Sequence, residues 1–183
     1  MRVVGGSERG RQLKAPTGSA VRPTSDKVKQ ALFNILGERV EGAVFLDLFA
    51  GAGGIGIEAL SRGAERVMFV DASRDSLSVV KQNIEELGFR SRAEALLSQA
   101  ELFLKKPSGP YDIVFLDPPY AEKMQPLLEL LGCAGILKHD SIVVAEHFRK
   151  QPLPENAGGL TRYRETRYGD TVLAFYKFTK EIL

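Results

Sequence analysis

The chain has 183 residues, of which 44% are apolar and 26% are charged. This composition excludes a disordered or fibrous protein, and the length suits one globular domain with a sizeable core. The apolar runs are far shorter than a membrane-crossing helix, and residues 1–20 lack the apolar core of a signal peptide. We therefore expect a cytoplasmic protein with no membrane partner. Cys133 is the single cysteine, which excludes an internal disulfide, and we expect it to be a small buried apolar residue.

The net charge of +2 hides an uneven distribution of charge along the chain. Residues 1–30 carry seven basic and two acidic side chains, residues 31–148 carry 11 and 17, and residues 149–180 carry seven and three. Basic segments with glycines between their arginines suit a mobile hairpin that follows the phosphates of a polyanion. We therefore predict that residues 1–23 form a basic arm; ordinary solvated surface charge is the alternative.

Strand-like and helix-like segments alternate after residue 24. An amphipathic pattern that follows the N-cap candidates Thr24, Ser25 and Asp26 and reaches Gly37 predicts the first helix. The predicted strands are Val44–Leu48, Arg66–Val70, Ala93–Leu97, Asp112–Leu116 and Ser141–Ala145, and the helices between them are Gly54–Ser61, Asp75–Leu87, Ala100–Lys105 and Met124–Leu131. This alternation predicts a doubly wound, Rossmann-like α/β domain over residues 24–183, with a mostly parallel sheet.

Two β-prone runs near the end predict a different arrangement. Leu160–Tyr168 and Thr171–Phe178 are separated only by Gly169 and Asp170, a pair that suits a tight turn. We expect an antiparallel hairpin at one edge of the sheet.

A glycine-rich loop follows the first predicted strand and opens the next helix. Gly51, Gly53 and Gly56 have the G-x-G-x-x-G spacing, and Asp71 lies 20 residues after Gly51 at the end of the second strand. A carboxylate there can accept hydrogen bonds from two ribose hydroxyls. These features indicate a cofactor that contains adenosine, with a purely structural strand-turn-helix as the alternative.

Asp47, just before this loop, separates the candidate cofactors. A carboxylate at this place would repel the pyrophosphate of NAD, whereas S-adenosylmethionine carries an amino group and a sulfonium and has no phosphate. The residue therefore favours S-adenosylmethionine over NAD.

The second motif is the tetrapeptide Asp117-Pro118-Pro119-Tyr120, directly after a predicted strand. The two prolines end both helix and strand and hold a stiff loop at the carboxyl edge of the sheet, where doubly wound folds bind ligands. The Asp117 carboxylate and the Pro118 carbonyl can accept both hydrogens of an exocyclic base amine, and Tyr120 can stack on the base. This reaction needs no metal or covalent nucleophile. A generic turn is the alternative.

At these motifs the chain resembles the class I S-adenosylmethionine-dependent methyltransferases that methylate amino groups. More narrowly, it is similar to the RsmD family, bacterial enzymes that methylate N2 of a guanine in 16S ribosomal RNA. The stretches that carry the closer resemblance are Val4-Gly5-Gly6, Gly10–Leu13, Arg22–Asp26, Ala31–Asn34, Gly56–Ala64 and Tyr168–Thr171.

The resemblance implies contacts to the cofactor residue by residue. Asp47, Phe49, Gly51 and Gly53 would line the methionine and ribose side, Asp71 would bind the ribose hydroxyls, Ala72 and Ser73 would flank the adenine, and Asp117 would border the methyl group. The family usually has an aspartate before an alanine near the adenine amine, where this chain has Gln99-Ala100. A glutamine oxygen can still accept from that amine, so we expect altered affinity rather than lost activity.

The implied partner is 16S ribosomal RNA, either free or within an assembling 30S subunit, and the family implies a monomer. Arg9, Arg11 and Lys14 are the candidates for phosphate contacts in the arm. Arg22 could reach a phosphate or the target base, although a salt bridge at the start of the first helix would also explain it. His139 and His147 are not spaced as a metal pair, and we expect them to have surface or structural roles.

Three other functions remain open from the sequence. A DNA adenine-N6 methyltransferase would use the same tetrapeptide, but the chain has no length left for a separate target-recognition domain. A catalytically idle RNA-binding assembly factor would not need an intact Asp117-Pro118-Pro119-Tyr120 loop. The third alternative is an NAD-dependent oxidoreductase.

Overall fold

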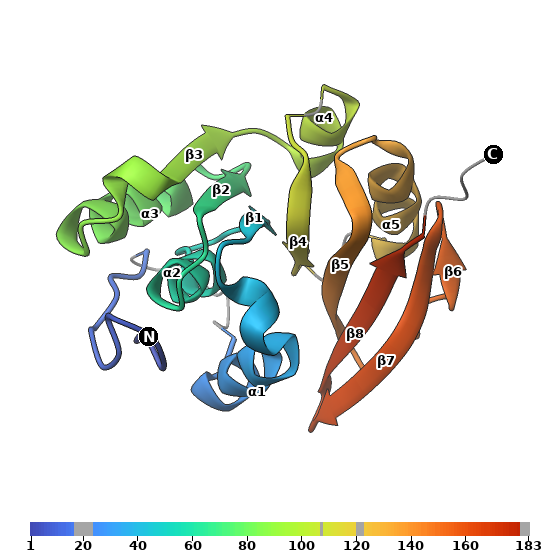
Figure 1. Ribbon diagram of the computed structural model, residues 1–183, viewed down its shortest axis with the longest axis horizontal. Helices are drawn as coiled ribbons and strands as arrows, with labels where there is room; N and C mark the ends of the chain where they lie inside the picture. The colour runs from blue at the N-terminus through green and yellow to red at the C-terminus, as the bar shows by residue number, and fades with distance from the viewer. Residues whose placement is uncertain (17–23, 107, 120–122, 180–183) are drawn as a thin grey trace.

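The computed structural model describes residues 1–16, 24–106, 108–119 and 123–179 (Figure 1). Arg22 and Tyr120, both singled out in the sequence, lie outside the described residues. The described strands are β1 (Val44–Leu48), β2 (Arg66–Asp71), β3 (Ala93–Leu97), β4 (Tyr111–Leu116), β5 (Leu137–Phe148), β6 (Asn156–Ala157), β7 (Leu160–Tyr168) and β8 (Thr171–Phe178). The helices are α1 (Asp26–Leu36), α2 (Gly54–Ser61), α3 (Arg74–Glu86), α4 (Ala100–Lys105) and α5 (Met124–Cys133), with 3-10 turns at Gly37–Val40 and Arg90–Arg92.

The described strands form one sheet in the order β3-β2-β1-β4-β5-β8-β7-β6. Strands β1 to β5 pair in parallel, while β8 is antiparallel to both β5 and β7. The predicted doubly wound fold, mostly parallel with an antiparallel C-terminal hairpin, is therefore confirmed. The order reverses between β1 and β4, so the carboxyl ends of these strands border the crevice where such folds bind ligands.

Helices cover both faces of the sheet (Figure 1). One face packs under α1, α2 and α3 in a core that includes Phe33, Phe45 and Phe69. The other face packs under α4 and α5 in a second core that includes Leu128 and Tyr176. Adjacent residues of β1 alternate between the two cores, because successive side chains of a strand point to opposite faces.

The described part of the N-terminal segment packs on the domain. Arg2 and Gln12 form an isolated antiparallel bridge, and Val3 and Leu13 are buried in the same core as α2. Their burial fixes residues 1–16 as a hairpin against α2. The division of the chain at residue 23 stays a prediction.

Two differences from the sequence-based expectations are the exposure of Cys133 and the length of β5. Cys133 is exposed at the end of α5, so its prediction as a buried residue was wrong. The reason is its place in the last turn, outside the stripe of Leu127, Leu128 and Leu131 that faces the sheet. Strand β5 begins before and ends after the predicted Ser141–Ala145, because its pairing with β8 continues to Phe148.

Candidate active site

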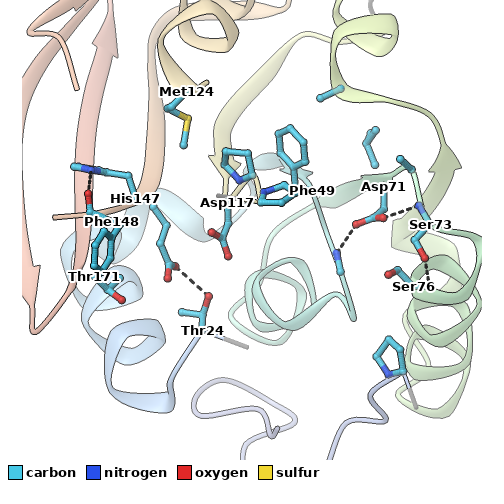
Figure 2. A pocket seen from close by; sticks show the side chains of 18 of the residues that line it. Thr24, Phe49, Asp71, Ser73, Ser76, Asp117, Met124, His147, Phe148 and Thr171 are labelled. Carbon is cyan, nitrogen blue, oxygen red and sulfur yellow. Dashed lines mark hydrogen bonds between the residues drawn. The ribbon is translucent and has the colours of Figure 1, made fainter. Parts of the chain in front are cut away.

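A cavity of about 1260 Å³ lies at the carboxyl ends of the parallel strands. Ten of the residues selected from the sequence line it: Phe49, Gly51, Asp71, Ala72, Ser73, Gln99, Ala100, Asp117, Pro118 and Pro119. They come from the ends of β1, β2 and β4 and from the start of α4, so the fold brings together residues up to 70 positions apart. Figure 2 shows Phe49, Asp71 and Asp117 around this space.

The glycine-rich loop takes its shape from left-handed backbone conformations. Gly51 and Gly53 have φ angles of 54° and 80°, and Phe49 has a φ of 70°, which a residue with a side chain rarely adopts. The Asp71 carboxylate ties this loop to the next one, because Oδ2 accepts from Gly51 N and Oδ1 accepts from Ser73 N, both at 2.8 Å (Figure 2). Asp71 is thus fixed at the edge of the cavity before any ligand arrives.

Asp47 and Gly53 lie below the loop rather than in the cavity wall. The Asp47 side chain points toward α2, and its Oδ2 accepts a hydrogen bond of 2.8 Å from Gly56 N in the first turn of that helix. Burial raises the pKa of Asp47 to about 8. A Cβ at Gly53 would lie 3.2 Å from Val80 and 3.3 Å from Phe69, so this glycine lets the loop pack closely on the core.

The Asp117-Pro118-Pro119 segment continues directly from the buried end of β4. All three residues reach the cavity, and burial raises the pKa of the Asp117 carboxyl to about 6. Pro118 and Pro119 have no backbone N–H, so their backbone offers only hydrogen-bond acceptors. Such a wall suits a ligand group that brings two donors.

Several lining residues were not selected as site residues from the sequence, and two of them lie near the end of β5. Glu146, near the end of β5, lines the cavity, and its Oε2 accepts a hydrogen bond of 3.0 Å from Thr24 Oγ1 (Figure 2). A signal was present, because Glu146 follows an apolar strand run directly, as Asp117 does. The strand order was needed to place the two strands side by side. His147, for which no site role was expected, also lines the cavity.

The charge of the lining restricts the ligand. The described lining residues include six carboxylates and no lysine or arginine; the acids are Asp71, Asp75, Glu101, Asp117, Glu146 and Asp170. Such a wall attracts a cation and repels a pyrophosphate. The cavity volume of about 1260 Å³ is above the range of about 300–1,000 Å³ that is usual for small-molecule sites.

The three described basic residues that were predicted to contact RNA, Arg9, Arg11 and Lys14, do not line this cavity. Arg11 pairs with Glu8 at 3.2 Å and Lys14 pairs with Glu86, both at the surface. Arg9 is exposed at the turn of the hairpin. The hairpin therefore presents basic residues, two of which are partly neutralised by neighbours.

Over the ranges that the structure describes, no group of three or more histidine, cysteine or acidic side chains is arranged to hold a metal. No described helix combines the length and apolar character needed to cross a bilayer.

Comparison with known proteins gives one consistent result. The model of a family described as conserved hypothetical protein 95 matches residues 1–177. YlbH of Bacillus subtilis, named as a candidate rRNA methyltransferase, is 45% identical over 97% of this chain and 98% of its own. The ribosomal RNA small subunit methyltransferase D of Escherichia coli K12 is 32% identical over 97% and 89%. The solved structure of yhhF of Escherichia coli, named as a candidate methyltransferase, has a TM-score of 0.90 at 30% identity, and the match covers 99% of each chain.

Proposed function

The chain belongs to the conserved hypothetical protein 95 family, the RsmD family, and from this premise we propose that it transfers a methyl group from S-adenosylmethionine to the exocyclic N2 of a guanine in 16S ribosomal RNA. One observation carries the proposal from the structure. The Asp117-Pro118-Pro119 loop and Asp71 share one acid-lined cavity at the carboxyl ends of the strands. This arrangement suits a cationic adenosine cofactor beside a base amine.

The cavity residues fit S-adenosylmethionine. Asp71, already oriented by Gly51 N and Ser73 N, would take the ribose hydroxyls. Gln99 and Ala72 would border the adenine, and the acidic lining would favour the amino group and sulfonium. Asp47 would act by holding the first turn of α2, since its carboxylate contacts Gly56 N. NAD fits less well, because the described lining offers no lysine or arginine for a pyrophosphate.

The wall formed by Asp117 and Pro118 would orient the target amine. When bound, S-adenosylmethionine supplies an electrophilic methyl group, whose carbon–sulfur bond breaks as the nitrogen–carbon bond forms, leaving S-adenosylhomocysteine and one proton. The Asp117 carboxylate and the Pro118 carbonyl would accept the two N2 hydrogens and so direct the nitrogen lone pair. Asp117 would also be an acceptor for the released proton. Tyr120 would stack on a base drawn out of the RNA.

The RNA itself would contact the rim rather than the acidic interior. Arg9, Arg11 and Lys14 would follow phosphates, and Arg22 would contact a phosphate or the target base. The names of the relatives support ribosomal RNA as the substrate class. We further propose that the enzyme acts as a monomer, on rRNA or on an assembling 30S subunit.

The test is methyl transfer from labelled S-adenosylmethionine to 16S rRNA and to 30S particles from cells that lack the gene. Digestion to nucleosides then identifies the product. We expect labelled N2-methylguanosine, lost in Asp117→Ala while cofactor binding persists. Label in N6-methyladenosine would support the rival specificity, and binding without any transfer would favour an RNA-binding factor.

A further inference from the structure

Two acidic side chains lie side by side at the base of the cavity. Strands β4 and β5 pair in parallel with Leu116 opposite Ala145, and the next residue of each strand is an acid, Asp117 or Glu146. Both follow by two positions a residue of the core under α1 and α2, Phe115 in β4 and Val144 in β5, so both side chains lie on that face. Burial and the Asp117 charge raise the pKa of Glu146. Two adjacent acids in a buried place favour a ligand with several hydrogen-bond donors.

Glu146 is oriented from the start of α1. Thr24, just before the N-cap Ser25, donates to Glu146 Oε2 at 3.0 Å across 122 positions of sequence. Among the described residues, none donates a hydrogen bond to Oε1. The contact thus fixes the carboxyl while leaving one oxygen for a ligand in the cavity.

The acceptors in this part of the wall match guanine better than adenine. On the Watson–Crick edge of guanine, the N1–H donor stands beside the two N2 hydrogens. On adenine, the exocyclic amine stands beside N1, which is an acceptor and would face a carboxylate with its lone pair. An acceptor next to the amine-binding pair therefore selects between the two bases.

We propose that Glu146, held by Thr24, accepts the N1–H of the target guanine and is the residue that selects guanine at this site. The proposal rests on the proposed guanine-N2 activity. Asp117 and the Pro118 carbonyl hold the N2 hydrogens, while Glu146 holds the neighbouring ring nitrogen. Glu146 takes no part in bond making, so its removal affects base selection more than cofactor binding.

The experiment compares two bases at the mapped target position of 16S rRNA rebuilt by ligation of a synthetic segment. One carries guanine and the other carries 2-aminopurine, which keeps the 2-amino group but has a lone pair in place of N1–H. The measured quantity is the ratio of kcat/KM for guanine to that for 2-aminopurine. Because 2-aminopurine also lacks O6, the ratio is compared between enzymes, so the effect of O6 cancels. Rates are compared at pH 8.5, because burial raises the pKa of Glu146 to about 8 and the ionised carboxylate is the acceptor; we expect Glu146→Ala to reduce the ratio roughly 10- to 100-fold, the range of a hydrogen bond to a charged group.

Two further variants keep the test decisive. Glu146→Gln, which preserves shape and adds an amide donor that can pair with the N1 of 2-aminopurine, is expected to reduce the ratio even if Glu146→Ala does not fold. Glu65→Ala removes an exposed acid next to β2 at the opposite end of the sheet and should leave the ratio unchanged. If N2-methylguanosine is the product and the Glu146 variants keep the wild-type ratio, the inference fails while the proposed function stands. If the wild-type product is N6-methyladenosine, both fail.

Discussion

At the scale of single residues, Asp117 has to be ionised to accept hydrogen bonds from a base amine. A carboxylate accepts hydrogen bonds through both oxygens, whereas the protonated carboxyl is partly a donor. Burial raises the pKa of Asp117 to about 6, and the neighbouring titratable groups are Glu146 and Asp47. The residue is therefore close to its titration range near neutral pH.

We predict that kcat for methyl transfer rises with pH and levels off above about pH 7. Below the raised pKa the carboxyl is protonated and its acceptor function is lost, so kcat falls about tenfold for each further pH unit below about 6. The measurement is a pH–rate profile with saturating cofactor. Asp117→Asn, whose amide oxygen does not titrate, should be slower at pH 8 and show no step near pH 6. A step of the same size in that variant would contradict the assignment.

The raised pKa of Glu146 leads to a second prediction, which concerns the thermal stability of the protein. Its folded-state pKa of about 8 lies above the ordinary value of 4.5 for a glutamate, so the folded protein holds an extra proton between these values and loses stability as pH rises through this window. Glu146→Gln removes this loss. We expect the variant to match the wild type near pH 4.5 and to exceed it at pH 8.5 by roughly 2–8 °C in Tm, the equivalent of about 1–2 kcal/mol. Thermal unfolding at the two pH values tests this, with Glu65→Gln as the exposed control.

The sequence predicted the parts of the site that are contiguous in the chain. Asp117 follows a strand and precedes two prolines, and Gly51 opens a recognisable loop, so local pattern was sufficient for both. Glu146 was missed because its place beside Asp117 depends on β5 lying next to β4, a fact of strand order. Asp47 was predicted to contact the cofactor, and this stays a prediction; the structure shows that its Oδ2 accepts a hydrogen bond from Gly56 N.

At the scale of elements, the packing of α2 on β2 depends on a glycine. A Cβ at Gly56 would lie 2.3 Å from Phe69 Cε1 and 2.9 Å from Val67 Cγ1, both side chains of the sheet. The helix lies too close to the sheet for any larger residue. The G-x-G-x-x-G pattern thus has a packing role at its last position as well as a conformational role at Gly51 and Gly53.

We therefore predict that Gly56→Ala destabilises the fold by about 1–3 kcal/mol through overpacking. The free energy of unfolding is measured by urea titration. The double variant Gly56→Ala/Phe69→Leu should lose less stability than the sum of the two single variants, because the smaller side chain makes room for the new methyl group. Strictly additive losses in the double variant would show that the collision is not the cause.

A buried ion pair joins the N-terminal hairpin to two helices. Glu58 of α2 accepts from Val4 N and Arg62 Nε, each at 2.8 Å, and lies 3.7 Å from Lys29 Nζ, while Lys29 also donates to the Arg2 carbonyl. Both Glu58 and Lys29 are almost completely buried. Burial lowers the pKa of Lys29, with the Glu58 charge opposing that shift.

We predict that Glu58→Ala destabilises the protein by about 3–5 kcal/mol, because it leaves the Lys29 ammonium buried without its partner. Lys29→Met/Glu58→Leu removes both charges and should cost less than Glu58→Ala alone. Chemical denaturation of the two variants makes the comparison. A larger loss in the double variant would mean that the hairpin depends on the hydrogen bonds of Glu58 rather than on charge pairing.

The bounds of helices and strands were predicted correctly where the sequence pattern was periodic. The two-residue strand β6 and the single bridge of the N-terminal hairpin have no such pattern and were not predicted. The bounds of α2, α4, β1 and β3 agree with the sequence-based ranges, because each carries an uninterrupted pattern. The short β6 has two residues and no pattern to detect. A mobile hairpin was expected because glycines stand between its arginines; in the structure the Arg2–Gln12 bridge joins its two sides, and Val3 and Leu13 are buried in the core.

At the scale of the whole molecule, charge is divided between an acidic cavity and basic ends. The described cavity lining carries six carboxylates, whereas residues 1–30 and 149–180 are basic. A cationic cofactor and a polyanionic RNA can therefore bind the same molecule at adjacent places without competing electrostatically. This division of charge predicts that S-adenosylmethionine binds in the acidic cavity and that RNA binds to the basic segments.

The cofactor should stabilise the fold by linkage. S-adenosylmethionine at 100 times its Kd contributes about 2.7 kcal/mol, which corresponds to a rise in Tm of roughly 5–11 °C for a chain of this size. NAD at the same concentration should leave Tm unchanged. Asp71→Ala should abolish the rise, although the loss of its bonds to Gly51 N and Ser73 N also lowers the Tm of the ligand-free variant. Stabilisation by NAD alone would contradict the assignment of the cavity.

The basic hairpin should govern the salt dependence of RNA binding, but its residues should not contribute equally. Each phosphate contact released by salt contributes about 0.7–0.9 to the slope of log Kobs against log salt. Arg9 has no acidic partner among the described ion pairs, whereas Arg11 pairs with Glu8 and Lys14 with Glu86. We predict that Arg9→Ala lowers the slope by about one contact and that Arg11→Ala lowers it less, because Glu8 already neutralises part of that charge. Filter binding of 16S rRNA between about 50 and 300 mM salt measures both slopes. Equal slopes for wild type and Arg9→Ala would move the RNA contact away from the hairpin, and the basic segment that begins at Arg149 would then be the next surface to test.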